Sequence, residues 1–247
     1  MDQTTFSTHE IANLIGVHPN TVRLYEKIGF ICPPQRKANG YRVFTCLHLK
    51  QMKLARTALK GEVLQNGLRK KAVEIIRLCA GCKITEAIEE TRNYDAMLAR
   101  EIENAQSAID FVENHLQATS PGQTVLLSRS QAAQALQISV DTLRNWELNG
   151  LVRIKRKNNG YRVYDQADLE RLRVIRALRS ANYSLSSILR LLNQYSEKDE
   201  FKIKEILNTP AQNETIISVC DRLLLSLEET RRDAASMLEI LEKFFSD

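Results

Sequence analysis

The chain has 247 residues and a formal net charge of +5, with 43% hydrophobic and 26% charged residues. These proportions are those of a folded protein and exclude wholesale disorder. No apolar run approaches the roughly 18 residues of a membrane span, and Met1–Thr4 do not resemble the start of a signal peptide. Five cysteines, spread thinly along the chain, indicate a reducing compartment. We therefore expect a cytoplasmic protein.

The charge is segregated along the chain. Residues 1–81 carry a net charge of +8, residues 82–126 carry −5, residues 127–192 carry +7 and residues 193–247 carry −5. This order predicts two basic modules, each followed by an acidic helical stretch. Basic surfaces attract polyanions through counterion release, so nucleic acid is the favoured partner. The alternative is a pair of solvated basic faces without a partner.

The chain repeats itself once. Asn39–Phe44 recurs as Asn159–Tyr164, 120 positions later, and Glu89–Arg92 recurs as Glu228–Arg231. Further matches lie upstream at an offset of 121, at Ser7, Ala12, Thr21, Arg23, Glu26 and Gly29, which correspond to Ser128, Ala133, Thr142, Arg144, Glu147 and Gly150. The pattern predicts a fused tandem pair of similar units.

Each copy begins with signals for two short helices. In the first copy, Ser7 with Glu10 forms a capping-box pattern that predicts a helix from about residue 8. Pro19 predicts the start of a second helix over Asn20–Lys27, which Gly29 should end. In the second copy the corresponding signals are Ser128 with Gln131, a helix over Asp141–Leu148, and Gly150. Two helices joined by a tight turn predict a helix-turn-helix.

A hairpin and a further helix follow the helix pair. The segment Phe30–Phe44 places Asn39-Gly40 between basic residues and β-formers, which is a strong hairpin signal. A hairpin beside a helix-turn-helix is a wing. Helices are predicted next over Leu47–Leu59 and, in the second copy, over Ala167–Leu178.

These elements present residues suited to DNA. Side chains at the start of a recognition helix can enter a groove, and an arginine fork fits both guanine edges and phosphates. For the aromatic residues Tyr25 and Trp146, packing in the core is favoured over a DNA contact, and packing is the alternative for Tyr41 and Tyr161. The candidate DNA-contacting residues are Ser7, Asn20, Thr21, Arg23, Tyr25, Arg36, Lys37, Tyr41 and Arg42 in the first copy, and Ser128, Thr142, Arg144, Trp146, Arg153, Lys155, Arg156, Tyr161 and Arg162 in the second, with Lys157 beside them.

These motifs resemble the signature of the MerR family of transcription regulators. The residues that carry the resemblance are Thr21–Glu26, Gly29-Phe30, Arg36 and Gly40–Phe44, and again Thr142–Glu147, Gly150-Leu151 and Gly160–Tyr164. The resemblance occurs twice, and the two copies together cover nearly the whole chain. Leu24 and Asn145 depart from it, because the family usually carries an aromatic residue there. We therefore expect half-site preferences that differ between the copies.

Two long stretches carry a heptad pattern. Residues 84–116 and 216–244 place apolar residues at alternating spacings of four and three, with Asp95 as the weak position in the first stretch. The resemblance implies homodimers joined by an antiparallel coiled coil of such helices. Because this chain contains both helices, we expect a single-chain pseudo-dimer. A true dimer with four heads is the alternative.

No catalytic constellation is present in the sequence, and we expect neither an enzyme nor a cofactor. Cys79 and Cys82 form a CxxC, which alone is a weak indication of a metal or redox site, since zinc needs about four ligands. Metal sensors of the resembling family carry a thiolate near this point and further thiols beyond the helix end. Here residues 118–123 and 244–247 contain no cysteine. Helix-boundary packing is the favoured interpretation, and core packing is favoured for Cys220.

An effector site is harder to place. Aromatic residues near the ends of the long helices are candidates for a small apolar ligand, although ordinary packing is the favoured interpretation. The candidates are Tyr94, Phe111, His115, Phe244 and Phe245, and the stretch Gln194–Gln212 with Tyr195, Phe201 and Pro210.

The predicted fold is mostly α, with two winged helix-turn-helix domains, each followed by a long helix of an antiparallel coiled-coil spine. The predicted parts are head A (residues 1–81), the first spine helix (82–118), a linker (119–126), head B (127–192), and connecting helices with the second spine helix (193–247).

The resemblance implies a nucleoid-associated regulator that binds an imperfect inverted repeat in double-stranded promoter DNA and distorts the spacer for RNA polymerase. A small-molecule effector is expected as a possible further partner, and a membrane is not. Two alternatives stay open: a small-molecule (multidrug) sensing protein, and an architectural or excision-type DNA-bending factor.

Overall fold

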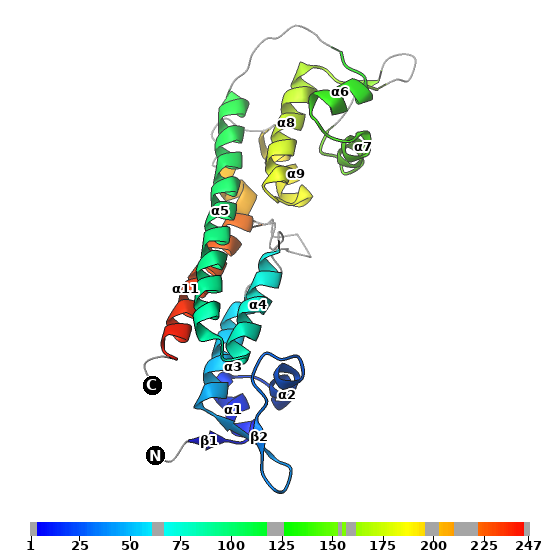
Figure 1. Ribbon diagram of the computed structural model, residues 1–247. Coiled ribbons are helices and arrows are strands. Elements are labelled where there is room, and N and C mark those ends of the chain that lie inside the picture. The colour runs from blue at the N-terminus through cyan, green and yellow to red at the C-terminus, as the bar shows by residue number, and fades with distance from the viewer. Residues whose placement is uncertain are drawn as a thin grey trace. The chain divides into compact units, whose positions relative to one another are not determined.

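The computed structural model describes residues 4–60, 67–117, 126–152, 155–156, 162–195, 203–209 and 222–244. In these ranges the chain is mostly helical, as predicted (Figure 1). Its contacts form two compact units: Met1–Arg100 with Ser226–Asp247, and Glu101–Leu225. Each unit contains one of the two repeated heads together with parts of the long helices. The finer boundaries between heads, linker and spine stay a prediction.

The first unit holds head A. Its elements are β1 (Thr5–Phe6), α1 (Thr8–Ile15), α2 (Pro19–Lys27), β2 (Gln35–Arg36), β3 (Arg42–Thr45), α3 (Cys46–Ala58), α4 (Leu68–Ala80), the first half of α5 (Ile84–Gln117) and most of α11 (Leu223–Glu242). The core of the head lies where α1 packs against α2, α3 and the sheet. Its fully buried side chains include Ile11, Val22, Phe44 and Met52.

The helix boundaries of head A follow from local hydrogen bonds. The Ser7 hydroxyl accepts the Glu10 N–H at 3.3 Å, and the Glu10 carboxylate accepts the Ser7 N–H at 2.7 Å, which confirms the predicted capping box. Helix α2 begins at Pro19, as predicted. The chain turns after it at Gly29, whose φ of +72° lies in the left-handed region that a glycine adopts without strain.

The sheet of head A has three antiparallel strands in the order β1-β3-β2. The predicted Asn-Gly hairpin is confirmed: Arg36 pairs with Arg42 in register, and Gly40 has a φ of +81°. Strand β1 was not predicted, because two residues are too few to show an alternating pattern. Its pairing of Phe6 with Phe44 attaches the segment before α1 to the hairpin.

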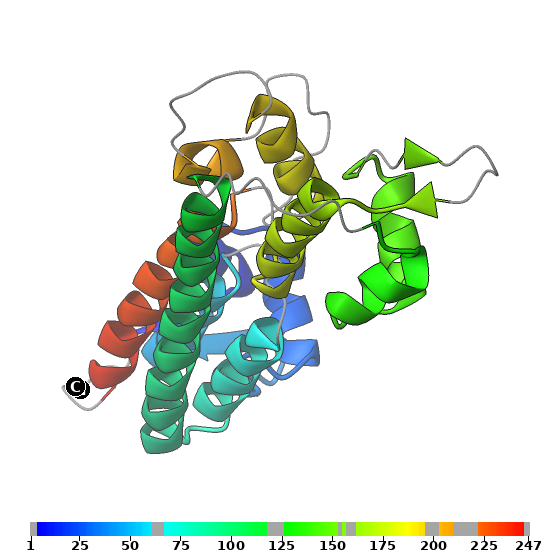
Figure 2. The same ribbon diagram turned by 90° about the horizontal axis from the view of Figure 1, so that it is seen from above.

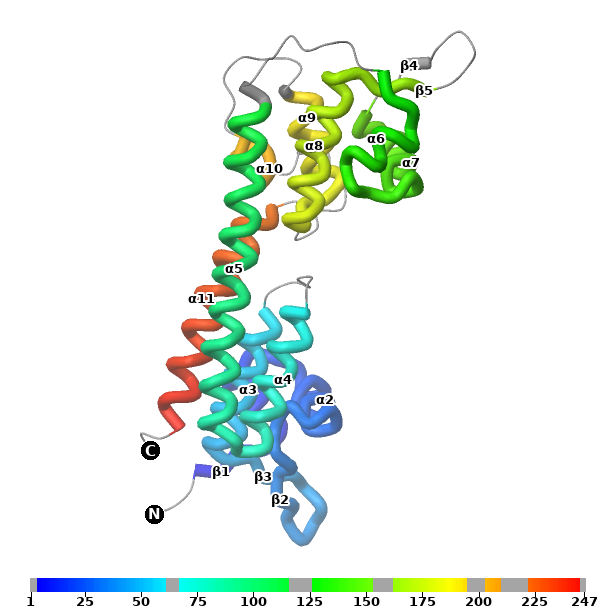
Figure 3. Tube along the Cα trace, turned by 45° about the horizontal axis from the view of Figure 1, so that its top comes forward, coloured from blue at the N-terminus to red at the C-terminus, as the bar shows by residue number. Residues whose placement is uncertain are grey.

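Helices α5 and α11 lie side by side within the first unit (Figures 1 and 3). The predicted heptad positions Thr91, Leu98 and Leu227 are buried, together with Thr230, Ala234, Met237 and Leu241. Asp95, the weak position, accepts hydrogen bonds from Arg231 of α11 at 2.9 and 3.3 Å. The polar residue is therefore compensated by a charge on the facing helix. The part of the second heptad stretch at residues 216–221 lies outside the residues described.

The second unit holds head B. It contains the rest of α5, then α6 (Arg129–Ala135), α7 (Val140–Leu148), β4 (Lys155–Arg156), β5 (Arg162–Val163), α8 (Gln166–Ser180), α9 (Leu185–Tyr195) and α10 (Ile203–Asn208). The predicted capping box of Ser128 and Gln131 is present. Seen from above in Figure 2, the two short strands lie beside the α6–α7 pair.

The same plan recurs in head B with a smaller sheet. Strands β4 and β5 pair antiparallel, with Arg156 opposite Arg162. The position of β1 is taken by a single bridge between Leu127 and Tyr164. Helices α8 and α9 run next to one another (Figure 3), and their buried side chains include Leu172, Ile175, Leu178, Leu191 and Leu192.

Among the residues that the structure describes, no helix has both the length and the apolar composition needed to cross a membrane.

Candidate nucleic-acid interface

The recognition helix of head A carries its polar side chains on an exposed surface. His18 caps the helix, because its Nδ1 accepts the Asn20 N–H at 3.1 Å. The Asn20 side-chain oxygen accepts a hydrogen bond from Arg23 at 2.7 Å, and both residues are exposed. Arg23 is therefore held in a defined position one turn into the helix, with the rest of its guanidinium open to solvent.

The hairpin of head A ends in a tight basic loop. The Gly40 N–H donates to the Lys37 carbonyl at 2.8 Å, and the Lys37 N–H donates to the Tyr41 carbonyl at 2.9 Å. The Tyr41 N–H donates to the Asn39 side chain at 3.3 Å. The Tyr41 side chain is 72% exposed, which is unusual for a large aromatic residue without a partner surface.

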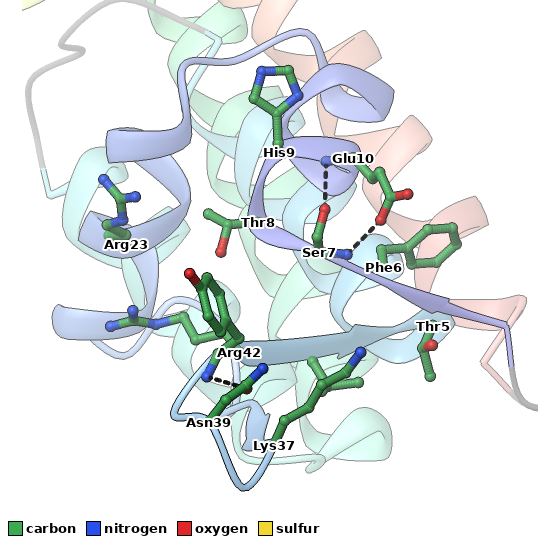
Figure 4. A pocket seen from close by; sticks show the side chains of 12 residues that line it. Thr5, Phe6, Ser7, Thr8, His9, Glu10, Arg23, Lys37, Asn39 and Arg42 are labelled. Carbon is green, nitrogen blue, oxygen red and sulfur yellow. Dashed lines mark hydrogen bonds between the residues drawn. The ribbon is translucent and has the colours of Figure 1, made fainter.

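A hollow of about 400 Å³ lies between α1, α2 and the hairpin. Figure 4 shows Arg23 from α2 and Lys37 and Arg42 from the hairpin around it, with Thr8 at the start of α1. The lining acid, Glu10, is engaged in the capping box, and the hydrogen bonds from Ser7 lower its pKa. The hollow therefore combines three cations with the N–H groups at a helix start, a combination suited to an anion.

An acidic residue of each recognition helix contacts the hairpin arginine. Glu26 accepts a hydrogen bond from Arg42 Nε at 2.6 Å, and Arg36 lies 3.7 Å away. In head B, Glu147 contacts Arg162 Nε at 3.2 Å and accepts two hydrogen bonds from Arg129 at 3.1 and 2.7 Å.

The recognition helix of head B repeats the exposed surface with different residues. Ser139 caps α7 by accepting the Thr142 N–H at 3.0 Å, and its hydroxyl also bonds the Thr142 hydroxyl at 2.8 Å. Arg144, the counterpart of Arg23, is exposed. The capping hydroxyl of head B thus replaces the capping imidazole of head A.

Comparison with known proteins shows the same repeated unit. The family described as "MerR family regulatory protein" matches residues 7–44, and the one described as "MerR HTH family regulatory protein" matches residues 127–195. The transcriptional regulator HmrR of Rhizobium leguminosarum bv. viciae is 30% identical over 104 residues, which cover 41% of this chain and 76% of HmrR. The chain belongs to the MerR family. It contains two MerR-like units.

Other relatives in the MerR family match over shorter stretches. The transcriptional regulator CueR of Escherichia coli O6:H1 is 39% identical over 49 residues, which are 20% of this chain and 36% of CueR. AdhR of Bacillus subtilis is 31% identical over 71 residues, 28% of this chain and 51% of AdhR. The chain thus spans only about a third of the length of CueR. No solved structure matches the chain.

Two of the candidate DNA-contacting residues belong to the core of their MerR-like units. Tyr25 and Trp146 are each only 5% exposed. The Tyr25 ring packs edge-on against Phe30, with 5.6 Å between the ring centroids. The favoured packing interpretation is therefore confirmed, and their place among the DNA-contacting candidates is corrected, because a buried ring cannot reach a groove.

The remaining candidates fall into two groups. Ser7 and Ser128 cap helices, so their side chains are already engaged by the backbone. Arg153, Lys157 and Tyr161, and the side chains of Lys155 and Arg156, lie outside the described part of the chain. The other side chains are exposed or half-buried on the helix-hairpin surfaces of the two heads: Asn20, Thr21, Arg23, Arg36, Lys37, Tyr41, Arg42, Thr142, Arg144 and Arg162.

Among the described residues, no group of three or more histidine, cysteine or acidic side chains is arranged to hold a metal ion. Cys79 is buried, and burial raises the pKa of its thiol to about 12. Cys82 is exposed, and both are free thiols. This arrangement fits the helix-boundary interpretation, while Cys220 lies outside the described residues.

The aromatic effector candidates are not all accessible. Tyr94 is 3% exposed, so its selection as a surface aromatic is corrected. Tyr94 and Ala87 are both buried although neither is a predicted heptad position, so α5 buries a second row of residues besides its heptad positions. Phe111 and His115 stack with ring centroids 3.7 Å apart on α5. Lys50 lies over the Phe244 ring at 5.4 Å. Phe245 and most of Gln194–Gln212 lie outside the description.

Sequence reasoning missed the two acids and Arg129. Glu26 and Glu147 match across the repeat, but this match alone does not indicate which residues they contact. The signal that could have found them is their recurrence together with Arg42 and Arg162, since an acid and an arginine repeated in both copies indicate a pair. Arg129 had no such signal, because Thr8 stands at its position in head A.

Proposed function

We propose that the chain is a transcription regulator that binds double-stranded promoter DNA through its two heads. The observation that carries this proposal is the surface shared by the recognition helix and hairpin of head A. There Arg23, Lys37 and Arg42 line one hollow, and Tyr41 stands exposed beside them. Such a surface can place side chains in a groove while the hairpin contacts the neighbouring phosphates.

Each head contributes two kinds of contact. Arg23 and Arg144 lie one turn into the recognition helices and are exposed, which supports a role in reading base edges. Arg42 and Arg162 lie on the hairpins and bind phosphates, together with Lys37 and Tyr41. Phosphate contacts supply affinity that falls with salt, whereas base contacts supply sequence preference.

Salt titration of DNA binding separates these roles. The probe is the DNA upstream of the gene, and binding is followed by fluorescence anisotropy from low to high salt. Arg42→Ala and Arg162→Ala each weaken binding to all sequences and reduce the salt slope by about one. Arg23→Ala instead relaxes sequence preference. Wild-type binding that is independent of salt contradicts the proposal.

The two heads are held by one polypeptide. We propose that α5 and α11 form an antiparallel coiled-coil spine and that the chain acts as a single-chain pseudo-dimer. The buried heptad positions and the Asp95–Arg231 contact support a pairing of these helices within the chain. Light scattering tests the proposal: a mass near 28.2 kDa is expected. About twice that mass would mean a true dimer with four heads.

The heads differ in sequence, so the target is an imperfect inverted repeat. Copying one half-site onto the other should weaken binding, and unchanged binding would contradict unequal half-sites. Bound to such a site in a promoter spacer, the protein distorts the DNA so that RNA polymerase can use misaligned promoter elements. The distortion costs on the order of 1–10 kcal/mol, offset by the contacts of both heads. Transcription in vitro from promoters with altered spacer length tests this step.

A further inference from the structure

The acids of the two recognition helices occupy the same position in the repeat but differ in their surroundings. Glu26 and Glu147 stand 121 positions apart, and their side chains are 18% and 7% exposed. Each lies within 3.2 Å of the Nε atom of the hairpin arginine of its own head, Arg42 or Arg162. Each acid therefore links the recognition helix to the hairpin.

In head A, Arg36 and Arg42 are the side chains that form ion pairs with this acid in the described part of the chain. Arg42 donates to Glu26 at 2.6 Å, and Arg36 lies 3.7 Å away. Arg36 and Arg42 face each other as register partners on β2 and β3. Among the described residues, the ion pairs of Glu26 are thus with the same hairpin arginines that it orients.

In head B the acid is held independently of the hairpin arginine. Arg129 of α6 makes two parallel hydrogen bonds to the Glu147 carboxylate at 3.1 and 2.7 Å. The hydroxyl of Tyr164, a fully buried side chain, also donates to Glu147. Glu147 therefore stays fixed if Arg162 moves.

Two substitutions between the copies account for the difference. Thr8 stands where head B has Arg129, and Phe44 stands where head B has Tyr164. Phe44 is fully buried and has no hydroxyl to donate. Head A therefore lacks both of the groups that fix the acid in head B.

We propose that Glu26 and Glu147 are positioning residues that orient Arg42 and Arg162 toward DNA phosphates, and that this device is pre-organised in head B but not in head A. The proposal rests on the proposed function, since it requires that the heads bind DNA.

The geometry explains how an acid can assist binding to an anion. A carboxylate that engages Nε leaves the outer N–H groups of the guanidinium free for a phosphate oxygen. Holding the arginine in place before binding lowers the entropy lost when DNA arrives. In head B the acid is already fixed by Arg129 and Tyr164 before DNA binds, so only Arg162 loses conformational entropy on binding. In head A both Glu26 and Arg42 lose conformational entropy when DNA binds.

The test uses the full chain and a mixed-sequence duplex of about three helical turns at low salt. Glu26→Gln and Glu147→Gln each lower affinity by about threefold to tenfold. Removal of a negative charge should by itself strengthen binding to DNA, so a decrease indicates positioning. Glu74→Gln on α4, an exposed acid outside the heads' binding surfaces, is the matched control and does not lower affinity.

Double-mutant cycles decide whether the acids act through the arginines. In an Arg42→Ala background Glu26→Gln has no further effect, and the same holds for Glu147→Gln in Arg162→Ala. A residue with only a structural role would lower affinity in both backgrounds. Additive effects, or single variants that bind as well as the wild type, overturn the inference.

Tyr164→Phe tests the asymmetry without a change of charge. It lowers affinity by about twofold to threefold, whereas Tyr183→Phe, at another fully buried tyrosine of the same unit, does not. If Glu147→Gln does not fold, Tyr164→Phe serves as the test for head B.

The outcomes for the two proposals can be distinguished. Wild-type protein that shows no salt-dependent binding to the duplex contradicts the proposed function. Normal wild-type binding, with variants that bind equally well, contradicts the inference alone.

Discussion

The two heads share a backbone plan but differ in the side chains that stabilise it. Both begin with a capping box, both end the recognition helix at a glycine with positive φ, and both continue into an antiparallel hairpin. In head A the acid of the recognition helix contacts two hairpin arginines. In head B the acid contacts the hairpin arginine Arg162, and it also binds Tyr164 and Arg129, which lies on the first helix. Duplication has therefore kept the local backbone signals, while the polar contacts between elements have diverged.

The heads also differ behind the recognition helix. In head A the buried side chain of Gln51 accepts the Cys32 N–H at 2.9 Å and donates to the Cys79 carbonyl at 3.0 Å. It thereby links the segment after α2 to the end of α4. In head B, Arg171 stands at this position of the repeat and donates to the Leu151 carbonyl at 2.8 Å. The same position of the repeat therefore bonds to the backbone after the recognition helix in both copies, but through different side chains and different backbone groups.

The largest difference in stability should come from truncating the two acids. Glu147→Ala removes the carboxylate that Arg129 and the Tyr164 hydroxyl both contact at a nearly buried site, so we expect a loss of about 2–3 kcal/mol. Glu26→Ala should cost about 1 kcal/mol, because its arginines can turn to solvent. Urea unfolding measures both. Equal losses would show that the extra contacts of Glu147 add no stability.

Gln51→Leu should destabilise the first unit by about 1–3 kcal/mol, because it leaves the half-buried Cys32 N–H without its partner and removes one of the two donors to the Cys79 carbonyl. Gln106→Leu, at a half-buried glutamine of α5 in the second unit, is the control and should cost little. Hydrogen exchange of the Cys32 amide reports the change directly. An unchanged exchange rate would contradict the bridge.

Tyr164→Phe should sharpen the comparison at alkaline pH. Burial, with the neighbouring Glu147, raises the pKa of Tyr164 to about 12, above the value near 10 of an unfolded tyrosine. The folded state therefore favours the neutral phenol, so this stability is fully present below pH 10 and is lost as the pH rises toward 12. The variant should lose less stability over that interval than the wild type. Thermal unfolding at several alkaline pH values measures the difference, and parallel curves would contradict it.

The smallest effect is expected where the long helices meet. Arg231 and Asp95 are 48% and 34% exposed, so solvent screens their attraction. Arg231→Ala should lower the free energy of unfolding by at most about 0.5 kcal/mol. A loss above about 1 kcal/mol in urea unfolding would mean that this pair is a main determinant of the helix pairing.

Much of the fold could be predicted because its signals act over a few residues. The Ser7–Glu10 and Ser128–Gln131 capping boxes, the turns at Gly29 and Gly150, and the hairpin at Asn39-Gly40 each depend on neighbours within one or two turns of chain. The heptad positions are nearly as local, since each repeats within one helix. For the same reason, the helix starts of both heads and the buried positions of α11 agree with their predicted places.

The candidate site was predicted less completely, because its contacts join distant parts of the chain. Sequence alone determined that Arg42 and Arg162 stand on hairpins beside recognition helices. Only the tertiary structure decided that Glu26 and Glu147 contact them, and that Tyr25, Trp146 and Tyr94 are buried. A partner 15 or more residues away leaves no periodic trace in the sequence. Burial likewise depends on which elements pack together, and that is settled only when the whole chain folds.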